Sequence, residues 1–165
     1  MTLSPRLASP DDADALSALF ARSYPPLLAP DYPPAVLDPA LPLMCRAQPA
    51  LLAAGRFWLI AGPHGPLAAG GWSVERPGTQ AVEPGLGHIR HVVCDPAATR
   101  RGLAAAILRA VMNQARAAGV ERLDCWSTRT AVPFYAAQGF SVIGPRDVVF
   151  PGGLVFPSVA MTRQI

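Results

Sequence analysis

The sequence predicts a single domain of the α/β (α+β) class over residues 1–165. Short apolar segments with strand character alternate along the chain with segments whose apolar residues recur at helical spacing. Hydrophobic residues make up 51% of the chain and charged residues 15%, which is typical of a packed protein and not of a disordered one. A chain of 165 residues can bury most of its apolar surface in one core, and no repeat or linker divides it.

Composition narrows the classes of function. No run approaches the ~18 apolar residues of a membrane span, and residues 1–14 lack the apolar core of a signal peptide. The net charge of +3 suits an anionic ligand, but the arginines are scattered, so nucleic acid is not expected. The cysteines Cys45, Cys94 and Cys125 are too far apart for a zinc site or a disulfide framework. We therefore expect a cytoplasmic protein without a metal or a membrane partner.

The N-terminal third of the chain predicts a strand and a helix. Apolar residues alternate over residues 3–7, which favours a strand. Residues 9–12, Ser-Pro-Asp-Asp, have the cap, the proline and the acids of a helix start. An apolar stripe over residues 16–20 continues this helix, which we expect to stop before Pro25.

Residues 24–50 are rich in proline. The eight prolines are Pro25, Pro26, Pro30, Pro33, Pro34, Pro39, Pro42 and Pro49. Proline removes a backbone donor and clashes with the preceding turn, so we predict short turns of helix here. Two interpretations remain open: the segment is a packed connection, or it forms one wall of a ligand pocket.

The rest of the chain alternates between strands and helices. A buried strand over 57–60 is followed by a turn at 62–66, a hairpin partner over 67–75 and a Gly- and Pro-rich loop over 76–87. The later predicted elements are a strand over 88–94, a helix from about Thr99 to Ala118 ended by Gly119, a strand over 120–126, a short helix over 132–138, and strands over 140–150 and 154–162.

The most informative stretch is residues 88–105, where a strand ends at Asp95-Pro96 and a helix opens near Gly102. The first N–H groups of a helix have no partner within it, and the helix dipole adds positive potential. The small Gly102 and Ala104 would let a phosphate approach the backbone, and Arg100 and Arg101 add suitable donors. A solvated helix start is the alternative interpretation.

Two motifs resemble those of the GNAT acetyltransferase superfamily. Val92-Val93-Cys94-Asp95-Pro96 followed by Thr99-Arg100-Arg101-Gly102-Leu103-Ala104 resembles its acetyl-CoA signature, although Thr99 stands where Gln or Arg is usual. Ala131-Val132-Pro133-Phe134-Tyr135-Ala136-Ala137-Gln138-Gly139-Phe140 resembles its second signature. The motifs occur in the family's order and spacing, and the resemblance covers nearly the whole chain. It implies a GNAT fold: a central mixed, mostly antiparallel sheet of six to seven strands flanked by about four helices.

The resemblance also implies where acetyl-CoA, the acyl donor, binds. The backbone of Val92, Val93 and Cys94 should run beside the pantetheine arm, at a β-bulge that splays the fourth and fifth strands. An N–H near Val93 would then meet the thioester carbonyl. The pyrophosphate should lie against Arg100, Arg101, Gly102, Leu103, Ala104 and Ala105. Cys94 replaces an apolar residue of the signature, so we interpret it as a core thiol and not as a nucleophile.

The resemblance gives Tyr135 the role of general acid, protonating the CoA thiolate as it leaves. An amine acceptor also needs a base, because an alkyl ammonium with a pKa of about 10.4 is protonated at neutral pH. In family members with a base on the fourth strand, it lies six positions before the signature valine, which gives His88. His91, Asp124, Glu83 and water remain alternatives. Alternate residues of a strand share a face, so two sets should point in opposite directions: His88, Arg90, Val92 and Cys94, and Ile89, His91 and Val93.

The predicted activity is transfer of an acetyl group from acetyl-CoA to an amine of a small molecule or peptide, directly in a ternary complex and in a possible homodimer. Residues 24–50, 76–87 and 151–157 should line the acceptor pocket, and their few acids disfavour a polycationic acceptor. Two other functions stay open: a non-catalytic acyl-CoA-binding module of this fold, and a nucleotide-binding enzyme, for which the Gly-x-Gly-x-x-Gly and P-loop patterns are missing.

Overall fold

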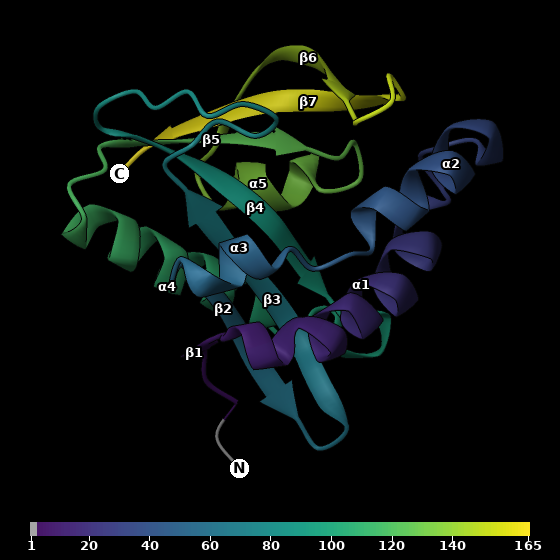
Figure 1. Ribbon diagram of the computed structural model, residues 1–165, viewed down its shortest axis with the longest axis horizontal. Coiled ribbons are helices and arrows are strands. Elements are labelled where there is room, and N and C mark those ends of the chain that lie inside the picture. The colour runs from purple at the N-terminus through teal and green to yellow at the C-terminus, as the bar shows by residue number, and fades with distance from the viewer. Residues whose placement is uncertain (1–2) are drawn as a thin grey trace.

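The computed structural model describes residues 3–165, which form one mixed sheet of seven strands with helices on both faces (Figure 1). The strands lie in the order β1-β2-β3-β4-β5-β7-β6. Their bounds are β1 (Arg6–Leu7), β2 (Phe57–Gly62), β3 (Gly65–Ser73), β4 (Leu86–Cys94), β5 (Arg122–Ser127), β6 (Ser141–Val149) and β7 (Val155–Gln164). Within the described chain, β4 and β5 pair in parallel and the other neighbours are antiparallel. The predicted mixed, mostly antiparallel sheet is confirmed.

The described residues also form five α-helices and two 3-10 turns. They are α1 (Ala13–Leu28), α2 (Pro34–Met44), α3 (Pro49–Ala53), α4 (Leu103–Ala117), α5 (Val132–Ala137), η1 (Pro10–Asp12) and η2 (Pro96–Ala98). Residues of α1, α2 and α3 pack in one cluster with Phe57, Leu59 and Val93 of the sheet. Residues of α4 and α5 pack in a second cluster with Trp72 and Leu123. The sheet therefore separates two layers of helices, and both clusters depend on the alternation of side chains along its strands.

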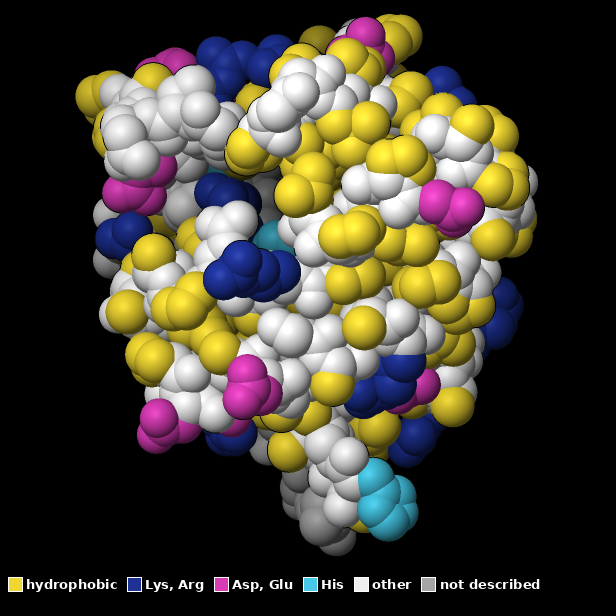
Figure 2. All heavy atoms as spheres, turned by 45° about the vertical axis from the view of Figure 1, so that its right-hand side comes forward, with side chains coloured by type: hydrophobic (Ala, Val, Ile, Leu, Met, Phe, Trp, Pro, Cys, Tyr) yellow, Lys and Arg dark blue, Asp and Glu magenta, His cyan; other side chains and the backbone are white. Residues whose placement is uncertain are grey.

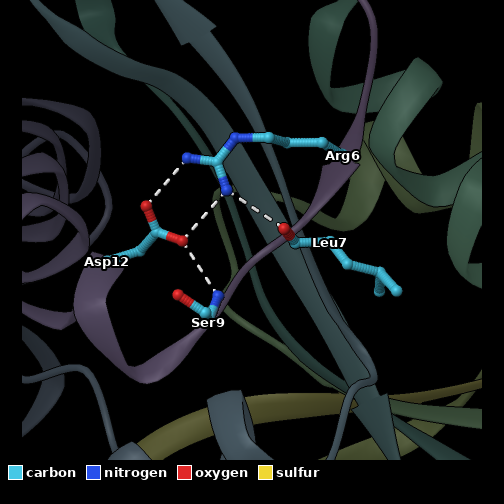
Figure 3. Close-up of polar contacts among 4 residues, drawn as sticks. All are labelled: Arg6, Leu7, Ser9 and Asp12. Atoms are coloured by element: carbon cyan, nitrogen blue, oxygen red, sulfur yellow. Dashed lines mark hydrogen bonds and ion pairs between the residues drawn. The ribbon is translucent and has the colours of Figure 1, made fainter.

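A small polar cluster joins the first strand to the first helix (Figure 3). The strand predicted over residues 3–7 is confirmed only for Arg6–Leu7, which pairs with β2. The Arg6 guanidinium donates to both carboxylate oxygens of Asp12, at 2.8 and 3.0 Å. The same carboxylate accepts the N–H of Ser9 at 2.9 Å, as a carboxylate near a helix start commonly does.

Two predictions about the proline-rich segment were wrong. Helix α1 does not stop before Pro25 but continues through Pro25 and Pro26 to Leu28, and α2 is an eleven-residue helix that contains Pro39 and Pro42. Burial overrides the low helix propensity of proline here, because buried residues recur on the inward face of each helix. In α2 these are Leu37, Ala40 and Met44, and in the last part of α1 they are Tyr24 and Leu28.

No helix in the described range combines the length and the hydropathy needed to span a bilayer.

Candidate active site

A β-bulge interrupts β4 in the middle of the sheet. In the pairing with β3, Gly71 lies opposite Arg90 and Ala69 opposite Val93, so His91 and Val92 together face Gly70. His91 has a left-handed backbone conformation, with φ of 52°, which accommodates the extra residue. The bulge therefore lies in the strand segment where the resemblance implied one.

The bulge changes which side chains of β4 share a face of the sheet, so part of the prediction from strand alternation was wrong. His88 and Arg90 share one face, as predicted, and their pairing with Ser73 and Gly71 places them on the face that carries α1. His91 also faces α1, stacking on Phe20 with ring centroids 5.1 Å apart. After the bulge, Val92 and Cys94 point to the α4 face and Val93 to the α1 face. Simple alternation placed Arg90 with Val92, which was wrong because the extra residue shifts the period by one.

Gly70 makes room for this bulge. A Cβ atom at Gly70 would lie 2.8 Å from Val92 Cγ2 and 3.1 Å from its Cα, closer than real Cβ contacts allow. We expect Gly70→Ala to lower the free energy of unfolding by about 1–3 kcal/mol, as overpacking does. Gly144→Ala is the matched control, because a Cβ there meets no atom within 4 Å. Urea unfolding of both variants checks this, and equal stabilities would contradict it.

Strands β4 and β5 separate after His88, just before the bulge. Their parallel pairing covers Leu86–His88 on β4 and Arg122–Asp124 on β5 and does not continue in the described structure. The β5-facing edge of residues 89–94 is therefore left without a strand partner, although β3 still pairs with Val93 and Cys94 on the other side. An extended molecule can hydrogen-bond to such an edge in place of a strand.

The turn between β4 and α4 exposes backbone donors. Helix α4 begins at Leu103, four residues later than predicted, because Arg100 and Gly102 have left-handed φ angles of 62° and 75°. A left-handed residue followed by a helical one turns successive N–H groups toward one concave side, which suits an anion. The first bond of the helix goes from Ala106 N–H to the Gly102 carbonyl, and the amides of residues 103–105 have no acceptor in the described structure. A Cβ on Gly102 would meet open space.

Two side chains beside this turn are engaged elsewhere. The Thr99 hydroxyl donates to the Pro96 carbonyl at 3.2 Å, so it is turned back into its own loop. The Cys94 thiol lies 3.5 Å from the Ala98 carbonyl, and burial raises its pKa. A protonated, hydrogen-bonded thiol is a poor nucleophile, in agreement with the interpretation of Cys94 as a core residue.

A cavity of about 730 Å³ opens between α1, α2, the bulge, α5 and the β6–β7 hairpin. Its wall includes Ile89, Arg90, His91 and Val92 from β4 and Tyr135 from α5. The remaining lining residues come largely from the segments predicted to wall a pocket, at 24–49, 77–78 and 151–156. The end of β6 over residues 148–149, which the sequence did not single out, also lines it. Figure 2 views this side and shows a hollow bordered by arginine side chains.

Tyr135 combines burial with access to the cavity. It is 4% exposed and packs edge-on against Phe134 and Phe140, with centroids 5.2 and 5.4 Å away. Burial raises the pKa of Tyr135 well above its usual value, and Cys125 and Tyr24 raise it further. The phenol is therefore protonated at neutral pH and can serve as a proton donor.

His91 and Tyr24 form a polar pair in the wall of the same cavity. Their Nδ1 and hydroxyl groups are 3.1 Å apart. Burial, together with the charge of Arg90, lowers the pKa of His91 to about 4. The imidazole is neutral at pH 7 but weakly basic. His91 packs beneath α1, against Phe20 and Tyr24. Tyr24 belongs to the segment that the sequence predicted to line the pocket, but its contact with His91 was not predicted.

The other candidate bases line a second, smaller cavity of about 470 Å³. His88, Asp124 and Glu83 border it, and Trp126 lies in the wall of both cavities. His88 is 5% exposed, and burial lowers its pKa below 6.5 against a smaller opposing effect of the Asp124 carboxylate. Asp124 is itself held by the Thr162 hydroxyl at 2.8 Å. Among residues 3–165, metal-binding side chains do not gather in groups of three or more.

Comparisons with known proteins agree with this architecture. Residues 74–157, half of the chain, match the family described as acetyltransferase (GNAT) domain. A GCN5-related N-acetyltransferase structure from Rhodopseudomonas palustris has a TM-score of 0.79 and 20% identity, covering 100% of this chain and 97% of that one. A PaiA N-acetyltransferase from Thermoplasma acidophilum, in complex with coenzyme A, has a TM-score of 0.70 and 11% identity over 100% of both chains.

A third solved structure, the ribosomal-protein-S18-alanine N-acetyltransferase of Escherichia coli, has a TM-score of 0.65 and 14% identity, over 98% of this chain and 93% of that one. At these identities the likeness concerns the fold. A comparison with curated proteins gave no match.

Proposed function

The chain belongs to the GNAT acetyltransferase family, and on that premise we propose that it transfers an acetyl group from acetyl-CoA to a primary amine of a small molecule or peptide. The transfer is direct, within a ternary complex, and needs no covalent enzyme intermediate. The three free cysteines are in keeping with a reducing, cytoplasmic setting.

One observation carries this proposal: the unpaired edge of β4 connects the free amides in the first turn of α4 to the cavity that Tyr135 lines. The amides of residues 103–105 would hold the diphosphate, with Arg100 and Arg101 as additional donors. The backbone of Val92, Val93 and Cys94 would hold the pantetheine arm as a strand partner. A chain so held ends beside Val92, which lines the same cavity as Tyr135.

The proposed chemistry assigns each proton. The amine nitrogen forms a bond to the acetyl carbon while the carbon–sulfur bond breaks. Tyr135 donates its phenolic proton to the departing thiolate, and the second proton that the attacking nitrogen loses on becoming an amide restores the Tyr135 phenol. An N–H near Val93 stabilises the negative charge on the carbonyl oxygen. His88 accepts the proton lost by the ammonium group, through water past Trp126, because it borders the adjoining cavity and is neutral at pH 7.

The two histidines predict different pH profiles. A base must be unprotonated, so kcat/KM falls as the pH drops through the base's folded pKa. With His88 as base, this fall lies below the ordinary histidine pKa of 6.5, because burial lowers the pKa of His88; with His91 as base, it lies near pH 4. We expect His88→Gln to lower kcat/KM by roughly 100-fold and to abolish this acidic limb. An unchanged profile in His88→Gln, with the limb lost in His91→Gln, would assign the base to His91.

The proposed activity is tested by measuring thiol release from acetyl-CoA with a panel of amines. We expect amine-dependent release of CoA with formation of one acetamide per thiol. Tight binding of acetyl-CoA with no release for any amine class would instead support an acyl-CoA-binding module.

A further inference from the structure

We propose that the acceptor carries a carboxylate close to its amine, together with an apolar body, and that the Arg90 guanidinium binds this carboxylate. The inference rests on the proposed function and specifies its acceptor class: amino carboxylates with apolar side chains.

The charge of the large cavity points to this class. Arg46 and Arg90 line the cavity, and no aspartate or glutamate in the described chain does so. An acceptor with only ammonium groups would meet positive charge there without any carboxylate to offset it. A carboxylate on the acceptor reverses the sign of that interaction, while the amine remains free to reach the thioester.

The Arg90 side chain is held by one hydrogen bond, and most of its guanidinium donors have no acceptor in the described structure. One guanidinium nitrogen donates to the Ser73 hydroxyl at 3.1 Å, and that hydroxyl donates to the Glu75 carbonyl at 2.8 Å. Glu75 is the carboxylate that acts on the Arg90 charge, yet the two form no ion pair within 4 Å in the described structure. Burial lowers the pKa of Arg90, but a guanidinium stays protonated at neutral pH. Its remaining donors match the two oxygens of a carboxylate.

Arg90 lies next to the bulge, near the reacting end of the cavity. It pairs with Gly71 on the α1 face, two positions before Val92 at the proposed thioester edge. Two strand residues span roughly 6–7 Å, and the Arg90 guanidinium leans toward Ser73, which pairs with His88. Contacts of about 3 Å at each end of the acceptor bridge much of the gap between the guanidinium and Val92. An amine and a carboxylate only a few bonds apart therefore fit between the two points.

Much of the remaining cavity wall is apolar, although polar side chains such as Ser127 and Thr128 also line it. Leu43 and Met44 line one side, and Val148, Phe150 and Phe156 line the other. Such walls favour a hydrocarbon or aromatic side chain over a second polar group, because polar atoms would be buried there without partners. The charged and apolar parts of the wall thus match the two parts of an apolar amino acid.

The test uses matched acceptors that differ in the carboxylate. Phenylalanine is compared with phenethylamine and phenylalaninamide, and leucine with 3-methylbutylamine, in the thiol-release assay. For the wild-type chain we expect kcat/KM to be at least about tenfold higher for each amino acid than for its uncharged analogue. Arg90→Met should remove this preference, and Arg90→Lys should keep part of it. The two amines of a pair also differ in intrinsic reactivity, but this difference is the same for every variant. It therefore cancels when the ratio of their kcat/KM values is compared between variants.

Arg116→Met is the matched control, because Arg116 lies in the last turn of α4 outside the cavity lining. It should leave the preference unchanged, and the wild-type ratios remain decisive if Arg90→Met fails to fold. Thiol release that is equal or faster with the uncharged amines, or a preference that survives Arg90→Met, would overturn the inference while leaving acetyl transfer intact. Absence of thiol release with every compound would overturn the proposed function and this inference with it.

Discussion

Gly102→Asp is expected to lower the affinity for CoA by at least 100-fold. Gly102 precedes α4 with a left-handed backbone, and a Cβ there points into open space where the diphosphate would lie. An aspartate places a negative charge about 5 Å from that diphosphate, which at an effective dielectric constant of 20 costs about 3 kcal/mol. Isothermal titration with CoA measures the loss.

Gly102→Asn is the isosteric control for this experiment. Asparagine and aspartate tolerate the left-handed conformation better than other non-glycine residues, so both variants should lose a similar stability of about 1 kcal/mol. Only the aspartate adds charge, and the difference in CoA affinity between them isolates the electrostatic part. Equal affinities of Gly102→Asp and Gly102→Asn would mean that the diphosphate does not bind at this turn.

Tyr135→Phe is expected to lower kcat by roughly 100- to 1,000-fold while the affinity for acetyl-CoA changes less than twofold. The substitution removes only the hydroxyl, and the ring contacts with Phe134 and Phe140 are retained. The expected loss concerns the thiolate leaving step alone, because the phenol has no part in holding the diphosphate. Steady-state kinetics and titration of the same variant separate the two quantities.

Tyr24→Phe is the control for the loss of a buried phenol in the same cavity. It removes the contact with His91 at 3.1 Å, but Tyr24 has no proton to supply to the thiolate in the proposed scheme. We expect its kcat to fall by less than tenfold. If Tyr24→Phe had the lower kcat and Tyr135→Phe were nearly normal, the general acid would be Tyr24 and not Tyr135.

Local patterns predicted most of the fold. Apolar spacing located α4, whose Ile107, Leu108 and Val111 are fully buried, and Gly119 ends it with φ of 86° as a helix-terminating glycine does. These features depend on neighbours within a few residues of the sequence. The continuation of α1 through Pro25 and Pro26 was not predictable in this way, because it depends on burial against distant strands.

The candidate site was predicted where it depends on the backbone of one segment, as in the turn before Leu103. It was not predicted where distant residues meet. The side of the sheet that Val92 and Cys94 face depends on a bulge opposite Gly70, more than twenty residues away in the sequence. The division of His88 and His91 between two cavities depends on Trp126, which comes from another strand. A prediction from strand alternation assumes regular pairing without a bulge, so it could predict neither feature.

The most direct test of this account is a crystal structure of the chain with CoA bound. The account predicts diphosphate oxygens within hydrogen-bonding distance of the amides of residues 103–105, the pantetheine arm along the unpaired edge of β4, and the sulfur beside the Tyr135 hydroxyl. A CoA molecule with its diphosphate elsewhere, or with its sulfur on the far side of the sheet from Tyr135, would contradict it.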